Sequence, residues 1–155
     1  MVYMSKENKM IQTNVGRLIS ILYRHAQMFH NQQLKDINIS SSEFPFLLYL
    51  NSIDGVTQET FAQFYGMDKA AVTRTIQSLE EKGFVYRAKN KEDLRCNHIY
   101  LTEQAKQILP ELKMRVDRWS SYLKEGLDEK EVEMVINVLN RMVEKVENNR
   151  NGELK

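Results

Sequence analysis

The hydrophobic residues of this chain recur mostly three or four positions apart, which is the spacing of amphipathic helices. Near the start, this spacing predicts a long helix from about Lys6 to Gln33. Toward the end, it predicts one long helix between Thr102 and Gly126, with Pro110 inside it, and another that starts at Asp128. The apolar positions of these three helices are Val15, Leu18, Leu22 and Phe29; Ala105, Ile108, Leu109, Leu112, Val116, Trp119 and Leu123; and Val132, Val135, Ile136, Leu139, Met142, Val143 and Val146.

Shorter patterns predict two small helices in the middle of the chain. The serines at 40–42 are N-cap candidates for a helix that runs to about Ser52, with Glu43 as the capping-box partner of Ser40. Thr57 can cap the next helix, over 58–64. The residues of that helix that we expect to face a core are Phe61, Ala62 and Phe64.

A further helix is predicted between Asp68, a good N-cap, and the helix-stopping Gly83. Its expected buried side consists of Ala71, Val72, Leu79 and either Ile76 or Thr75. Its opposite side carries Lys69, Ala70, Thr73, Arg74 and Gln77. We therefore expect one face of this helix to pack and the other to meet solvent or a ligand.

From Phe84 the hydrophobic period changes to two, which is typical of a β-strand. Phe84, Tyr86 and Ala88 alternate with the residues between them, and 98–101 is predicted as a returning strand after a charged loop at 90–97. A two-stranded hairpin is marginal alone, so it must pack against the helices. The predicted fold class is mainly α with a small two-stranded β-wing.

The composition, with 42% hydrophobic and 28% charged residues, is typical of a soluble globular protein. The longest apolar run, 44–50, is far shorter than the roughly 18 residues that cross a bilayer, so we expect no membrane partner. No secretory signal pattern is visible, and the single cysteine, Cys96, cannot form an internal disulfide. These features favour a cytoplasmic location.

The net charge of +1 hides a local basic edge. Seven Lys and Arg residues lie between 66 and 102, on the predicted helix and hairpin. They are Lys69, Arg74, Lys82, Arg87, Lys89, Lys91 and Arg95.

The three long helices carry more apolar surface than one monomeric core would cover. We therefore expect a homodimer formed through them, and the alternative is a monomeric helical bundle. On this interpretation, 1–39 is an N-terminal dimerisation helix and 103–155 forms the C-terminal dimerisation helices, with a separate domain, 40–102, between them.

The order of elements in 40–102 is that of a winged helix-turn-helix, whose second helix enters a major groove of double-stranded DNA. The positive end of the helix dipole at Asp68 favours phosphate, while Thr73, Arg74 and Gln77 can hydrogen-bond to base edges or backbone oxygens. We expect Lys89 and Lys91 to meet phosphates.

Four segments of the sequence resemble the MarR family of transcriptional regulators. They are Met67-Asp68-Lys69-Ala70-Ala71-Val72-Thr73-Arg74, Leu79-Glu80-Glu81-Lys82-Gly83-Phe84-Val85, Asp93-Leu94-Arg95 and Leu101-Thr102. The resemblance covers nearly the whole chain, because long terminal helices that form a dimer interface are also the MarR arrangement. It implies a homodimer that binds a palindromic operator, usually as a repressor, and that releases it when a small ligand or an oxidant arrives.

The resemblance also implies roles for single residues. Arg95 matches the wing arginine that enters the minor groove, with Asp93 expected to orient it, and Thr73, Arg74 and Gln77 match recognition-helix positions that face DNA. Other interpretations remain open at this point. Arg74 could pair with Glu81 or Asp68, Asp93 could form an ordinary ion pair, and the hairpin lysines could serve only solubility.

In the MarR family, the ligand sits where the dimer helices meet the DNA-binding lobe. By rough position, the candidates here are His25, Phe29 and Phe46, which would suit a flat aromatic or apolar effector, although they could equally be core residues.

No cofactor or metal is expected. His25 and His30 are five positions apart and do not share a helix face, and relatives that sense zinc use histidines on the fifth helix, whereas no histidine follows His98 here. No catalytic motif is present, so we expect no enzyme.

The sequence therefore predicts a homodimeric DNA-binding repressor that responds to a small ligand. One alternative is a redox-sensing regulator acting through Cys96, although this residue lies in the wing and not in the first helix, where peroxide-sensing relatives carry their cysteine. The other alternative is a winged-helix module that binds a protein partner instead of DNA.

Overall fold

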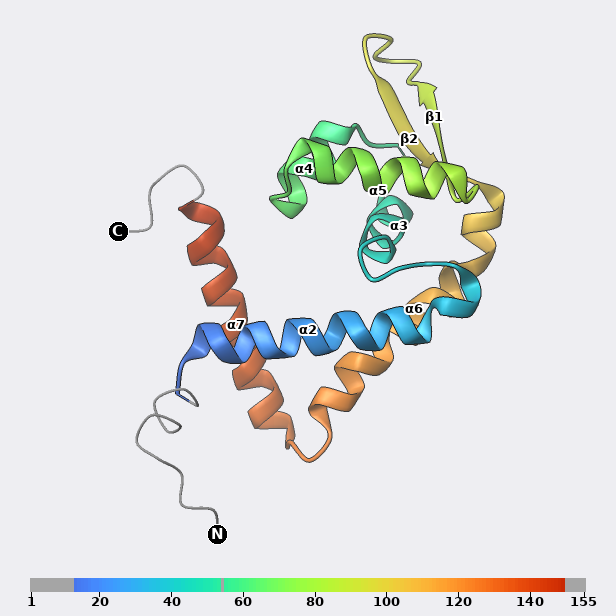
Figure 1. The fold of residues 1–155 in the computed structure, drawn as a ribbon. Coiled ribbons are helices and arrows are strands. Elements are labelled where there is room, and N and C mark those ends of the chain that lie inside the picture. Colours follow the sequence, from blue (N-terminus) through green and yellow to red (C-terminus); the bar gives the residue numbers. More distant parts are fainter. Residues whose placement is uncertain (1–12, 54, 150–155) are drawn as a thin grey trace. The chain divides into compact units, whose positions relative to one another are not determined.

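The computed structural model describes residues 13–53 and 55–149 (Figure 1). In chain order, the elements are α2 (Val15–Gln33), the short 3-10 helix η1 (Lys35–Ile37), α3 (Phe44–Ser52), α4 (Gln58–Tyr65), α5 (Lys69–Glu81), β1 (Val85–Lys89), β2 (Asn97–Leu101), α6 (Glu103–Lys124) and α7 (Glu129–Asn148). The predicted fold class, mainly α with a two-stranded wing, is confirmed. The chain separates into two compact units, Met1–Trp119 and Ser120–Lys155, and the division falls inside α6.

The first long helix begins later than predicted where the structure describes it. Asn14 is an extended N-cap residue whose Oδ1 accepts a hydrogen bond from the backbone N–H of Arg17 at 2.8 Å. This cap starts α2 at Val15, and residues 6–12 of the predicted helix lie outside the described residues. The apolar spacing alone could not show the break, because a capping residue does not disturb the spacing around it.

The start of α3 also differs from the prediction. The helix begins at Phe44, with Glu43 as its N-cap and Pro45 in its first turn. One half of the predicted capping box is present, since Oε2 of Glu43 accepts from the backbone N–H of Ser40 at 2.8 Å. The Ser40 hydroxyl is instead 3.0 Å from that of Ser42. The carboxylate of Glu43 also accepts hydrogen bonds from Ser78 and Lys82, as described below.

The helix-turn-helix starts and turns where the sequence predicts. The side chains of Thr57 and Asp68 accept backbone hydrogen bonds that cap α4 and α5, at 3.1 and 2.7 Å. Between the two helices, Gly66 has φ 60°, a left-handed conformation that glycine adopts readily and that ends α4. These local signals fix the positions of both helices along the chain.

The packing of α4 corrects one expectation. Phe61 is fully buried, but Phe64 is 55% exposed, so its predicted place in the core is wrong. Tyr65 turns inward instead, where its hydroxyl donates to the carbonyl oxygen of Pro45 at 2.7 Å. Phe64 packs near the surface against the rings of Tyr49 and Tyr65.

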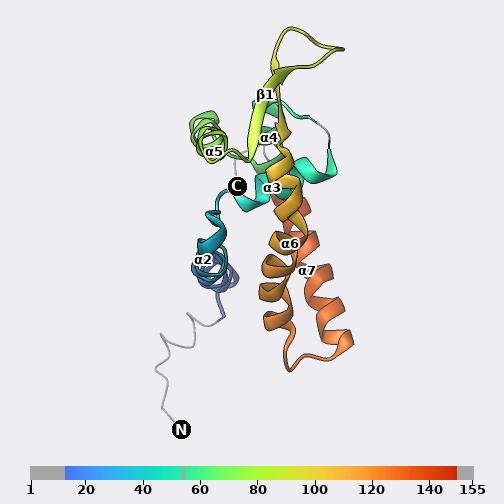
Figure 2. The ribbon, with the colours of Figure 1, turned by 90° about the vertical axis from the view of Figure 1, so that its right-hand side faces the viewer.

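The hairpin pairs in antiparallel register, from Val85 opposite Leu101 to Lys89 opposite Asn97. Phe84 and Val85 are both buried, although adjacent residues of a strand point to opposite faces. Phe84 lies before β1, so the alternation of side chains between the two faces begins at Val85, one residue later than predicted. Figures 1 and 2 show the hairpin projecting beyond the helices of its unit.

A third segment pairs with the outer side of β2 at its middle residue. Val56 forms an antiparallel bridge with Ile99, and their backbone N–H and C=O groups exchange hydrogen bonds of 3.2 and 2.8 Å. Next to it, Gly55 has φ +85°, and a Cβ there would lie 2.5 Å from the ring of Tyr100. Only glycine fits this close approach.

The core of the first unit joins α3, α4, α5, the hairpin and the first half of α6. Its largest fully buried side chains are Phe46, Phe61, Leu34, Leu47, Ile76, Leu79, Ile99, Leu112 and Val72. This core packs against the face of α5 that carries Val72, Ile76 and Leu79 and leaves the opposite face to solvent, because a helix at the edge of a core buries only one stripe.

The second unit, Ser120–Lys155, contains the end of α6 and the helix α7 (Glu129–Asn148). α7 has a complete capping box between Asp128 and Glu131, as befits its predicted start at Asp128. No described residue of α7 is buried, and its apolar face, including Ile136 and Leu139, is exposed. Leu123, predicted on the apolar stripe of α6, is likewise exposed. No helix in the described chain is long and apolar enough to cross a membrane.

Candidate nucleic-acid interface

The outer face of α5 consists of the residues that the sequence places there. Val72, Ile76 and Leu79 are at most 1% exposed. The exposed residues on the other side are Lys69, Ala70, Thr73, Arg74 and Gln77. This division follows from the helical period of 3.6 residues. A residue four positions after a buried one, such as Ile76 after Val72, lies on the same face, whereas the next residue, Thr73, is turned by about 100° away from it.

Two of the seven predicted basic residues do not belong to this surface. Lys82 pairs with Glu43 at 2.8 Å, and Nε of Arg87 lies 3.0 Å from the carboxylate of Glu80. Both pairs are partly shielded from solvent, so these charges are held within the protein.

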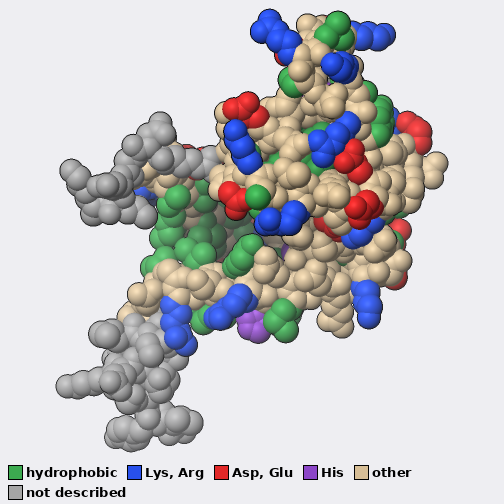
Figure 3. Space-filling view, turned by 45° about the horizontal axis from the view of Figure 1, so that its top comes forward, with side chains coloured by type: hydrophobic (Ala, Val, Ile, Leu, Met, Phe, Trp, Pro, Cys, Tyr) green, Lys and Arg blue, Asp and Glu red, His purple; other side chains and the backbone are tan. Residues whose placement is uncertain are grey.

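The other five basic residues are exposed and take part in no ion pair with a described residue. They are Lys69 and Arg74 on α5 and Lys89, Lys91 and Arg95 on the wing. Figure 3 shows Lys and Arg side chains gathered at the tip of the hairpin. In particular, Arg74 forms an ion pair with neither Glu81 nor Asp68, the two partners that the sequence allowed. We define these five residues as the basic face.

The wing loop is shaped by side chains that bind its own backbone. Oδ1 of Asp93 accepts from the backbone N–H of Arg95 at 3.0 Å, and Nζ of Lys89 donates to the carbonyl of Leu94 at 3.1 Å. Asp93 thus sets the backbone at Arg95 through an Asx turn and forms no ion pair with its guanidinium. Cys96 is exposed, and its sulfur lies 4.0 Å from Oδ2 of Asp93.

A chain of polar contacts links α4, α5 and β1. Arg87 donates to both carboxylate oxygens of Glu80 at 3.0 Å and to Oε1 of Gln58. Nε2 of Gln58 donates to the hydroxyl of Thr73 at 2.8 Å, and this hydroxyl donates to the carbonyl of Lys69 at 2.8 Å. We name these five residues the Gln58 network. Sequence analysis missed it because Gln58 and Arg87 are 29 positions apart.

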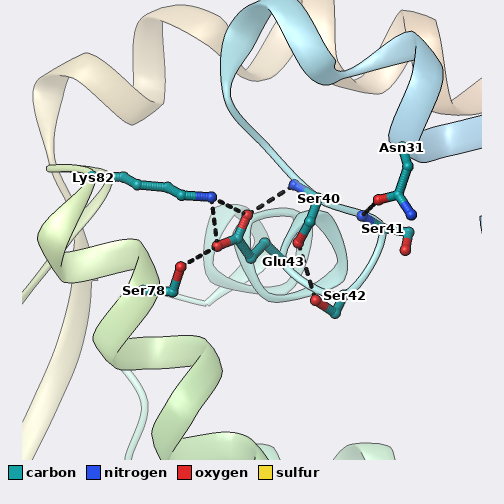
Figure 4. A network of polar contacts seen from close by, with 7 residues as sticks. All are labelled: Asn31, Ser40, Ser41, Ser42, Glu43, Ser78 and Lys82. Carbon is teal, nitrogen blue, oxygen red and sulfur yellow. Dashed lines mark hydrogen bonds and ion pairs between the residues drawn. The ribbon is translucent and has the colours of Figure 1, made fainter.

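A second network fixes the far end of α5 (Figure 4). The buried carboxylate of Glu43 accepts hydrogen bonds from Ser78 at 2.6 Å, from Lys82, and from the backbone N–H of Ser40. Burial alone would raise the pKa of Glu43, but these donors outweigh it and hold the pKa below its ordinary value. Nearby, Oδ1 of Asn31 on α2 accepts from the backbone N–H of Ser41.

Comparison with known proteins identifies the family. The model of the MarR family matches residues 39–97. The uncharacterized HTH-type transcriptional regulator YdgJ of Bacillus subtilis (strain 168) is 31% identical over 110 residues, which cover 71% of this chain and 67% of YdgJ. A crystal structure of a MarR transcriptional regulator from Methanosarcina mazei Go1 is 32% identical, with a TM-score of 0.79 over 84% of this chain and 94% of that chain. The chain belongs to the MarR family.

A MarR-family protein is a DNA-binding transcriptional regulator and not an enzyme, which agrees with the two predictions made from the sequence. The winged fold is further matched by a putative MarR family transcriptional regulator from Listeria monocytogenes that was crystallised with 26mer DNA. It is 20% identical, has a TM-score of 0.83, and covers 92% of this chain and 98% of that chain.

In this MarR-family chain, the three predicted ligand residues do not come together. His25 is exposed on α2, whereas Phe46 is 1% exposed and packs against Phe61 and Tyr65 in the core. Phe29, one helical turn after His25 on α2, belongs to an aromatic cluster whose other members are His30, Phe44 and Trp119.

Sequence analysis missed His30 as a distinctive residue of this cluster. It is buried, its Nδ1 has no hydrogen-bond partner among the described residues, and desolvation lowers the pKa of its imidazole. Its ring lies 4.7 Å from that of Phe44, between centroids. The only sequence signal was its helical position one residue after Phe29. In the described part of the chain, no three His, Cys, Asp or Glu side chains are placed to hold a metal ion.

Proposed function

We propose that this MarR-family regulator is a homodimeric repressor that binds a palindromic operator through α5 and the wing and is released by a small ligand. The observation that carries the proposal is the basic face, whose five side chains are exposed and form no ion pair with any residue of 13–53 or 55–149. Unpaired cations are the groups that gain most when they replace the counterions of phosphate.

Each part of the surface has a different role in this proposal. Thr73, Arg74 and Gln77 on α5 contact base edges in the major groove, with Lys69 and Ala70 close to the backbone at the start of the helix. Lys89 and Lys91 bind phosphate. Arg95 enters the neighbouring minor groove, and its backbone is held for this by the Asx turn of Asp93.

Dimerisation is supported by apolar surface that one chain leaves exposed. Leu18, Ile19 and Leu22 on α2, and Ile136 and Leu139 on α7, are each between 43% and 48% exposed. Contiguous apolar faces of this kind belong to interfaces more often than to monomer surfaces. A two-fold dimer presents two α5 helices to half-sites about 10 base pairs apart.

Release by a ligand requires a ligand that binds the two states of the dimer differently, because it shifts the population only by that difference. The aromatic cluster of Phe29, His30, Phe44 and Trp119 supports an aromatic or apolar effector, since it joins α2, α3 and α6. His25 and Phe46 are then outside the first contacts of the effector.

Footprinting of the purified protein on DNA upstream of its own gene tests the binding, and analytical ultracentrifugation tests the dimer. We expect a protected palindrome and a sedimenting mass of two chains. Transcription from the same promoter in a purified system tests repression, and cell extract in the footprinting reaction tests release. A monomer, or absence of any protected site, contradicts the proposal.

The alternatives are separated by two measurements. Binding of DNA through several phosphates falls steeply with salt, whereas an apolar protein contact does not. A redox mechanism through Cys96 requires that Cys96→Ser abolish a response to oxidant. In the described part of the chain, Cys96 is exposed and its sulfur lies 4.0 Å from the carboxylate of Asp93.

A further inference from the structure

The Gln58 network has only one consistent arrangement of donors and acceptors. The guanidinium of Arg87 can only donate hydrogen bonds, so the Gln58 atom that faces it must be the amide oxygen. The other end of the amide, which faces Thr73, must then be the NH₂ group. The ion pair with Glu80 holds the guanidinium of Arg87 in place, and the direction of every other hydrogen bond in the network follows from this donor.

The consequence falls on the hydroxyl of Thr73. A hydroxyl has one hydrogen and two lone pairs. One lone pair accepts from Gln58 at 2.8 Å, and the hydrogen is donated to the carbonyl of Lys69 at 2.8 Å. A single lone pair remains for the exposed side of α5. Thr73 therefore meets DNA as an acceptor and not as a donor, although threonine in general can act as either.

We infer that Thr73 discriminates against guanine at the base it contacts, and that Gln58 and Arg87 are the positioning residues that impose this preference. In the major groove, adenine and cytosine offer an amino group that can donate to Thr73, whereas guanine offers only the acceptors N7 and O6. The inference rests on the proposed function, because it requires the outer face of α5 to lie in a major groove.

Gln58 acts by holding the threonine side chain in one rotamer. With hydrogen bonds from Gln58 and to Lys69, χ1 of Thr73 is fixed from two sides. Without the Gln58 donor, the hydroxyl can leave the Lys69 carbonyl and donate outward. Guanine then becomes an acceptable base. Because Gln58 lies on α4 and Arg87 on β1, neither needs to touch a base for this effect.

The inference is tested by selection from a duplex library randomised across one half-site of the footprinted operator, followed by sequencing. The base position at which Thr73→Val changes the selected sequences identifies the contact. At that position, we expect the wild-type protein to disfavour guanine relative to adenine or cytosine by about fivefold or more. Thr73→Ser, which keeps the hydroxyl, keeps this preference.

Gln58→Met retains the length of the side chain and removes the donor, so we expect guanine to come within about twofold of adenine and cytosine at the same position, with other positions unchanged. Gln107→Met, on the exposed surface of α6, is the matched control and leaves all preferences unchanged. Thermal unfolding of each variant shows that it is folded. If Gln58→Met does not fold, the comparison of Thr73→Val with Thr73→Ser still decides the case.

Several results would overturn the inference. If guanine is selected as well as adenine or cytosine, or if Thr73→Val alters no position, Thr73 has no such role while DNA binding stands. A folded Gln58→Met with wild-type preferences removes Gln58 from the mechanism. If the wild-type protein selects no sequence at all, the proposed function fails and this inference fails with it.

Discussion

Nζ of Lys82, at the end of α5, lies 2.8 Å from Oε2 of Glu43, at the start of α3. The side chain of Glu43 is almost fully buried, at 4% exposed, and the side chain of Lys82 is 24% exposed. This ion pair joins the helix that carries the basic face to the segment that follows α2. The orientation of α5 therefore depends on a charge pair within the protein as well as on its apolar stripe.

Removal of the buried carboxylate is expected to destabilise the fold. Glu43→Ala leaves Lys82, Ser78 and the Ser40 N–H without their acceptor, so we expect the free energy of unfolding to fall by about 3 kcal/mol. Urea denaturation at a fixed protein concentration measures it. Glu103→Ala is the control, because its ion pair with Lys106 is exposed and is worth at most about 1 kcal/mol. Equal effects of the two variants would contradict this account.

Acidification is expected to destabilise the protein through His30. Desolvation lowers the pKa of His30 in the folded state, so the unfolded chain binds the proton more readily. Stability is then lost as the pH falls below about 6.5, the ordinary value for histidine. The lowered pKa values of Glu43 and Asp36 cost stability only at lower pH, below about 4.3.

Denaturation of His30→Phe between pH 7.5 and 5.5 measures this contribution. We expect a flatter profile than that of the wild-type protein, because phenylalanine fits the aromatic cluster and does not titrate. His25→Phe is the control, since His25 is exposed. A variant as sensitive to pH as the wild type would show that another group is responsible.

Arg95→Ala tests the wing. If the guanidinium enters a minor groove, we expect operator affinity to fall about tenfold, with the sedimenting mass and thermal stability unchanged. Fluorescence anisotropy with a labelled operator measures the affinity. Lys113→Ala removes an exposed charge from α6 and is expected to change the affinity little. Full affinity of Arg95→Ala would exclude the guanidinium from binding.

Salt dependence separates bound phosphates from solvated charges. Lys69→Ala and Lys91→Ala are each expected to reduce the slope of log K against log salt concentration by about one, because each removes one phosphate contact. Titrations between about 50 and 300 mM salt, over which the Debye length falls from roughly 14 Å to roughly 6 Å, give the slope. Lys106→Ala serves as a comparison away from the basic face. An unchanged slope would mean that the lysine stays solvated in the complex.

A charge on the apolar face of α7 tests the dimer. Leu139 is 44% exposed in one chain, and the proposed dimer buries it. We expect Leu139→Glu to convert the dimer to a monomer in sedimentation velocity and to abolish operator binding, whereas Arg141→Glu, two residues along and on the other side of the helix, leaves the dimer intact. Dimerisation by the Leu139 variant would locate the interface elsewhere.

Much of the fold was predictable because its signals are local. Thr57 and Asp68 act on N–H groups three residues away, and Gly66 ends a helix by its own conformation. The exposed face of α5 followed from a period of 3.6, which needs no knowledge of what it packs against. Phe64 escaped this reasoning because a helix of two turns offers more apolar positions than its neighbours can cover.

The sequence by itself determined the order of the elements, the face of α5 that meets solvent, and the family, since each is written in neighbouring residues. Tertiary structure alone decided which charges remain free. Lys82 and Lys91 are equivalent in a sequence, but Lys82 meets a carboxylate 39 positions away, and Arg87 and Arg115 meet acceptors 29 and 79 positions away. Such pairs form only when packing brings remote segments together, and no local pattern records which segments will meet.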